Sequence, residues 1–117
     1  MTEINQFISS SVEKINAFQS MVEQLSRESN LCRSAINDLG FAALHEWETQ
    51  KGSSLSHLAM QQPAQRVRGL DQIIGYFEKC MQENTWSDSM IQKNLVLIRQ
   101  TLETIFEIRS DTEIFSG

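Results

Sequence analysis

The chain has 117 residues, with fifteen acidic and ten basic side chains and a formal net charge of -5. This length suits a single helical domain spanning residues 1–117 and argues against a second domain. The acidic balance and the lack of a lysine and arginine cluster argue against nucleic acid as a partner. Five glycines and one proline are few for the length, so long helices are favoured over a sheet with many turns.

A recurring apolar stripe predicts a first helical arm over residues 3–50. Apolar side chains follow alternating steps of four and three, the spacing of a heptad seam, for about six heptads. A helix with such a seam packs it against another helix or a hydrophobic surface. The seam residues that we expect at a hydrophobic surface or interface in this arm are Ile4, Ile8, Ile15, Phe18, Val22, Leu25, Ile36 and Leu39.

Residues 51–63 form the predicted connector. Gly52 suits a helix C-cap, Ser53 or Ser54 suits the N-cap of a short helical turn, and Pro63 suits the first turn of the next helix. The connector is therefore interpreted as the turn between two arms.

A second arm is predicted over residues 64–109, followed by a short tail at 110–117. The same stepping starts again at Val67 and runs through this arm without a phase slip. Its seam residues, expected at the same surface or interface, are Leu70, Ile74, Phe77, Ile91, Leu95, Ile98, Leu102 and Ile105.

Each arm contains a polar weak point, at residues 26–30 and 84–89, where Ser87 or Asp88 suits an N-cap. If the arms stay straight, the all-α chain is a long antiparallel hairpin of roughly 70 Å. Such a hairpin leaves much of its apolar stripe exposed to water, which implies that the chain forms a homo-oligomer or adsorbs to a hydrophobic surface. If both arms break, the chain is an up-and-down four-helix bundle. Both alternatives have coiled-coil-like packing.

The two cysteines, Cys32 and Cys80, match no metal or redox spacing. We interpret them as buried, reduced thiols, with a disulfide between them as the alternative. No leader pattern and no apolar run long enough for a transmembrane segment is visible, so we expect a cytoplasmic protein.

The sequence predicts no catalytic, cofactor-binding or metal-binding residues, and hence no enzyme. His45 is expected on a helix flank, and His57 lacks the context of a catalytic triad. Lys51-Gly52 resembles the corresponding stretch of histidine phosphotransfer domains, but Glu48 stands at the phosphoacceptor position. That resemblance implies an inactive relative at most.

Two other kinds of residue bear on binding. Trp86 lies in the second polar break and is a possible exposed anchor, although tryptophan on a helix is more often a core residue. Arg66 and Arg68, followed by Asp71, are interpreted as solvated or paired charges.

Three short stretches carry a family resemblance over roughly residues 15–80. They are Ala35-x-x-x-Leu39-Gly40-x-x-x-Leu44, the connector segment Ser54-Leu55-x-x-Leu58-Ala59-x-Gln61, and Gly75-Tyr76-Phe77. Together they resemble the small phasins. The resemblance implies a non-catalytic amphipathic coat protein that binds polyhydroxyalkanoate granules, lies at the granule surface in the cytoplasm, and self-associates.

The seam departs from that family in being rich in isoleucine, phenylalanine and leucine, which favours a firm closed core. The alternative function is therefore a helical-bundle adaptor, chaperone or inhibitor that binds a specific protein partner.

Overall fold

The computed structural model describes residues 7–108, which are helical with short connections and contain no strand. A helical turn at residues 7–9 precedes α2. The elements that follow are α2 (Val12–Ser29), α3 (Arg33–Lys51), α4 (Leu55–Ala59), α5 (Pro63–Glu83) and α6 (Asp88–Ile105).

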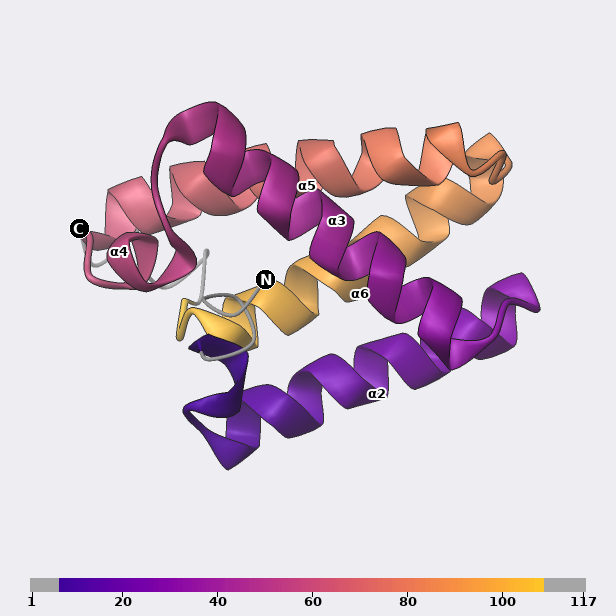
Figure 1. The fold of residues 1–117 in the computed structure, drawn as a ribbon, viewed down its shortest axis with the longest axis horizontal. Helices are drawn as coiled ribbons and strands as arrows, with labels where there is room; N and C mark the ends of the chain where they lie inside the picture. Colours follow the sequence, from indigo (N-terminus) through magenta and orange to yellow (C-terminus); the bar gives the residue numbers. More distant parts are fainter. Residues whose placement is uncertain (1–6, 109–117) are drawn as a thin grey trace.

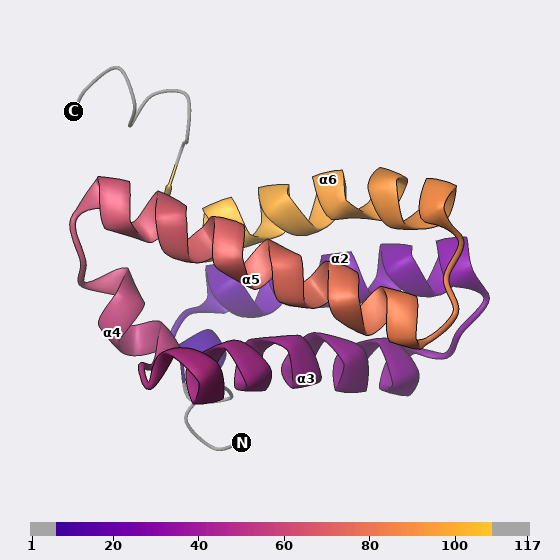
Figure 2. The same cartoon turned by 90° about the horizontal axis from the view of Figure 1, so that it is seen from above.

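The four long helices form an up-and-down bundle (Figures 1 and 2). α3 packs against α5, α5 against α6, α6 against α2, and α2 against α3, so the ring of helices is closed. The molecule measures 39 × 30 × 28 Å, which is too short for a straight hairpin of roughly 70 Å. The all-α prediction is confirmed, and of its two alternatives the bundle is the one found.

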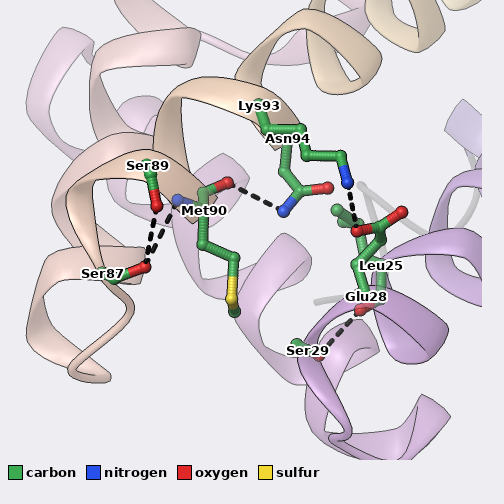
Figure 3. A network of polar contacts seen from close by, with 8 residues as sticks. All are labelled: Leu25, Glu28, Ser29, Ser87, Ser89, Met90, Lys93 and Asn94. Atoms are coloured by element: carbon green, nitrogen blue, oxygen red, sulfur yellow. Dashed lines mark hydrogen bonds and ion pairs between the residues drawn. The ribbon is translucent and has the colours of Figure 1, made fainter.

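Both arms break at the same end of the bundle, opposite the connector (Figure 2). α2 ends at Asn30, whose φ of 61° is left-handed, a conformation that asparagine tolerates better than most residues. α6 begins at Ser87, whose hydroxyl accepts a hydrogen bond from the Met90 N–H at 3.3 Å. Figure 3 shows this cap beside the ion pair of Lys93 and Glu28, which joins α6 to α2 at 2.8 Å. The predicted N-cap at Ser87 is confirmed.

The predicted seam lies inside the bundle. Ile4 is outside the described residues, and Ile15, Ile74 and Leu95 are partly buried. The other seam residues are buried: Ile8, Phe18, Val22, Leu25, Ile36, Leu39, Leu70, Phe77, Ile91, Ile98, Leu102 and Ile105. The apolar stripe that we expected at a surface or interface is therefore covered by the chain's own helices.

The sequence pattern missed part of this core. The stepping passes through Ile74, whereas Ile73, its neighbour, is 0% exposed. Leu44 is also buried beside the seam. A helix surrounded by two neighbours buries a wider stripe than a two-helix seam needs, which explains the difference.

One ion pair crosses each of the four contacts between long helices. All four lie at the surface, where each such pair contributes at most about 1 kcal/mol, so they favour the correct helix order more than they stabilise the fold. They are Arg33–Glu23 at 3.5 Å, Lys79–Glu46 at 2.6 Å, Arg99–Asp71 at 2.8 Å and Lys93–Glu28 at 2.8 Å.

Over residues 7–108, no helix has the length and apolar character required to cross a membrane.

Candidate functional site: a cationic cleft beside the connector

The C-terminal end of α3 is closed by local caps. Gly52 takes the left-handed conformation with φ of 61°, and its N–H donates to the Glu48 carbonyl. The Glu48 carboxylate accepts the Leu55 N–H at 2.9 Å, and the Ser54 hydroxyl accepts the His57 N–H at 3.1 Å. These bonds begin α4 immediately after α3 ends, and they confirm the predicted caps at Gly52 and Ser54.

α4 packs tightly on the first half of α5. Leu55 and Leu58 are buried, and Leu58 lies over Gly69 so closely that a Cβ there would come within 2.5 Å of its Cδ1. Pro63 occupies the first turn of α5, as predicted. The short helix therefore holds the connector against both α3 and α5.

This packing leaves a cleft of about 260 Å³ between α3, the connector and α5. One wall belongs to α3 and the other to α5, whose cleft residues are spaced by three and four positions and so share one helix face. The lining residues are Trp47, Lys51, Ser53, His57, Leu58, Gln61, Gln65, Arg68, Gly69 and Gln72.

The Trp47 side chain links the two walls. Its indole Nε1–H donates to Gln72 Oε1 at 3.2 Å, and the residue is only 3% exposed. Because the Gln72 oxygen accepts this bond, the amide nitrogen of the same side chain provides donors. This hydrogen bond thus joins the α3 wall of the cleft to the α5 wall.

The cleft holds the basic side chains of this structure that lack a partner. Residues 7–108 contain nine lysines and arginines, and five of them pair with carboxylates. Lys14 lies over the Phe7 ring at 4.0 Å, and Arg66 donates to the Phe106 carbonyl at 3.0 Å. The remaining two, Lys51 and Arg68, both line the cleft, which is therefore a place where an anionic group gains charge partners.

A wider, open basin of about 600 Å³ adjoins the cleft and shares Ser53 and His57 with it. His45 and Glu48 also line the basin, and His45 is exposed on its helix as predicted. His57 contacts the Gln61 amide nitrogen through Nε2 at 2.8 Å. In the part of the chain that the structure describes, no three histidine, cysteine or acidic side chains are grouped to hold a metal.

Trp86 is buried, although it was a candidate for an exposed anchor. The residue is 8% exposed and belongs to the core at the end of the bundle where the arms break. The interpretation as an exposed anchor is wrong because the loop between α5 and α6 folds the indole inward instead of presenting it to solvent.

The two thiols differ in environment. Cys80 is buried and Cys32 is exposed, and both are free, so the prediction of two buried thiols is wrong for Cys32. Burial raises the pKa of the Cys80 thiol, and the nearby carboxylates of Glu46 and Glu83 raise it further. The exposure of Cys32 follows from the break between α2 and α3, which removes it from the helical stripe.

The cleft does not follow from the apolar pattern of the sequence. Arg68 was interpreted as a solvated or paired charge, and Lys51 only as part of the connector. The available signal was the spacing of Gln65, Arg68 and Gln72 on one helix face, together with Trp47 and Lys51 one turn apart. That spacing does not reveal that this face of α5 lies opposite Trp47 and Lys51 of α3. Their relative position depends on how α4 packs in the connector.

Comparison with protein-family models, with curated proteins and with solved structures gave no match for this chain.

Proposed function

We propose that this chain is a non-catalytic helical-bundle adaptor that binds a specific protein partner at the cleft beside the connector. The observation that carries the proposal is the pair of basic side chains without partners, Lys51 and Arg68, on the two walls of that cleft. Elsewhere in residues 7–108 the lysines and arginines are engaged within the chain.

The burial of the seam supports an adaptor over a coat formed by the folded bundle. A surface coat needs an exposed apolar stripe, whereas each large apolar side chain that is exposed within residues 7–108 comes from a different segment of the chain. They are Val12, Leu31, Met60 and Val96.

Site-specific photo-crosslinking tests the proposal. A photoreactive phenylalanine analogue replaces Gln65, which is exposed at the cleft, and a matched variant carries it at Gln92, which is exposed on α6. We expect one partner to crosslink at position 65 and not at 92, and the purified pair to bind saturably. Equal labelling at both positions, or no product that can be reconstituted from purified components, contradicts the proposal.

A granule coat remains a second candidate because of one feature of the packing. α3 packs most extensively on α5 and α2 on α6, and the two breaks lie at the same end of the bundle. Straightening both breaks would keep those two helix pairs together and expose the seam to a polyhydroxyalkanoate surface or to a second copy of the chain. In this second candidate the bundle is a storage form that opens on adsorption.

Co-sedimentation with polyhydroxybutyrate particles, run beside light scattering, separates the two candidates. Adsorption that requires opening competes with the stability of the bundle, so a destabilised variant adsorbs more and a stabilised one less. Phe77→Ala serves as the first and Gly75→Ala as the second. Particles left bare by the wild type and by Phe77→Ala eliminate the coat.

A further inference from the structure

The charge and shape of the cleft point to the chemistry of its occupant. We propose that it holds an acidic segment of the partner protein in an extended conformation, with a carboxylate paired to Lys51 and Arg68. This inference rests on the proposed function, because it names the chemical class of the partner surface that the adaptor binds.

The two cations reach the cleft from different elements. Lys51 is the last residue of α3, and Arg68 lies in the second turn of α5, so a bound carboxylate would be held from both walls. The planar guanidinium of arginine matches the two oxygens of a carboxylate, and lysine adds a compact charge. A ligand held by both would also tie the connector end of α3 to α5.

Two nearby acidic groups have partners of their own within the chain. Glu48 accepts the Leu55 N–H through one carboxylate oxygen, and Asp71 pairs with Arg99 at 2.8 Å. The chain as a whole carries a net charge of -5, which repels acidic partners at a distance. At physiological salt, however, charges interact over about 8 Å, so a group inside the cleft feels the two cations more strongly than the distant acidic residues of the chain.

Amide side chains complete a set of donors suited to an anion. Gln61, Gln65 and Gln72 line the cleft. The Gln72 oxygen is occupied by the Trp47 indole, and the Gln61 amide nitrogen keeps one N–H beyond its contact with His57. Amide nitrogens donate hydrogen bonds to carboxylate oxygens and leave the charge to the two cations. The cleft therefore provides a carboxylate with two positive charges and with hydrogen-bond donors that orient it.

The size of the cleft favours a side chain over a free small molecule. Its volume of about 260 Å³ lies below the roughly 300–1,000 Å³ of ordinary small-molecule sites. The wider basin lies beside it, with Ser53 and His57 in the lining of both, which leaves space next to the cleft for the backbone of a peptide. One or two acidic side chains in the cleft, with the main chain crossing the basin, fit this shape.

Titration by nuclear magnetic resonance tests the inference, since the two tryptophan indoles are built-in reporters. Trp47 lines the cleft, and Trp86 lies at the opposite end of the bundle. We expect a capped hexaglutamate peptide to shift the Trp47 indole signal saturably and leave that of Trp86 in place. A capped hexaglutamine peptide should shift neither signal.

Paired charge variants supply the control. Lys51→Gln with Arg68→Gln should weaken hexaglutamate binding by at least about tenfold. Arg27→Gln with Lys93→Gln makes the same change in net charge on other faces of the bundle and should preserve binding. Equal weakening by both pairs, or equal binding of hexaglutamine, overturns the inference. Inorganic phosphate alone causing the same Trp47 shift at lower concentration overturns it as well, in favour of a free-phosphate site.

The crosslinking experiment separates this inference from the proposed function. If a partner crosslinks at position 65 and binds the Lys51→Gln/Arg68→Gln variant as tightly as the wild type, the adaptor function stands and the acidic ligand is wrong. If hexaglutamate binds as expected and no partner is found at position 65, the anion site stands and the adaptor function is wrong.

Discussion

Gly69 and Leu58 fit together where α4 lies on α5, with no room between them for another methyl group. A Cβ built on Gly69 would stand 2.5 Å from Leu58 Cδ1 and 2.8 Å from its Cδ2. Leu58 is 6% exposed and belongs to the core. This contact holds the connector in the position that forms the cleft.

Gly69→Ala should therefore displace Leu58 and loosen α4, whereas Gly75→Ala should stabilise the bundle. Both glycines lie in α5, where alanine is favoured over glycine by up to about 1 kcal/mol, and a Cβ at Gly75 has no neighbour within 4 Å. We expect the urea midpoint to rise in Gly75→Ala and to rise less or fall in Gly69→Ala. A larger gain at 69 than at 75 would show that the contact is not tight.

Ser87→Ala should destabilise the protein by about 0.5–2 kcal/mol because it removes the cap of α6. The wild-type hydroxyl accepts the Met90 N–H, as Figure 3 shows. Ser89→Ala is the matched control, since Ser89 is exposed in the first turn of the same helix. Thermal unfolding followed by circular dichroism measures both, and equal effects at 87 and 89 would argue against the cap.

Phe77→Ala should cost about 3–5 kcal/mol, since this α5 side chain is 0% exposed and its removal leaves a cavity. Val96→Ala, at a position 59% exposed, should change stability by less than about 0.5 kcal/mol. Chemical denaturation with urea compares the two. A small loss at Phe77 would mean that the bundle interior repacks readily.

We expect alkaline pH to lower the free energy of unfolding, in part because the Cys80 thiol ionises more readily in the unfolded chain. The pKa of its thiol is raised above the ordinary value of 9.0 in the folded chain. Below pH 9.0 the thiol is protonated in both states and its contribution is fully present. Above pH 9.0 the unfolded thiol ionises while the folded one stays protonated, so stability falls as pH rises.

Comparison of urea midpoints at about pH 8 and pH 10 checks this linkage. The decrease between the two pH values should be smaller in Cys80→Ala than in the wild type. Cys32→Ala, which removes the exposed thiol, serves as the control. If Cys80→Ala loses as much stability as the wild type on raising the pH, the buried thiol is not responsible.

Features decided by neighbouring residues were predictable from the sequence. The end of α3 at Gly52, the cap at Ser54, the start of α5 at Pro63 and the cap at Ser87 were all anticipated. Each depends on backbone conformation or on a hydrogen bond within one turn, and such interactions follow from local residue type.

The candidate site was harder to predict because its parts are distant in sequence. Lys51 and Arg68 line one cleft only after α4 has packed on α5 through Leu58 and Gly69. The same dependence explains Trp86, whose burial is decided by the loop that follows α5.

By itself, the sequence determined that the chain is helical, where its polar breaks lie and which side chains are apolar enough to pack together. Local propensity and periodicity carry this information. Only the tertiary structure decided that both arms fold at their breaks, that the seam becomes the core of one closed bundle, and that two basic residues remain unpaired in a cleft. These outcomes depend on which helices pack against each other. Contacts between residues far apart in the chain cannot be predicted from local sequence patterns.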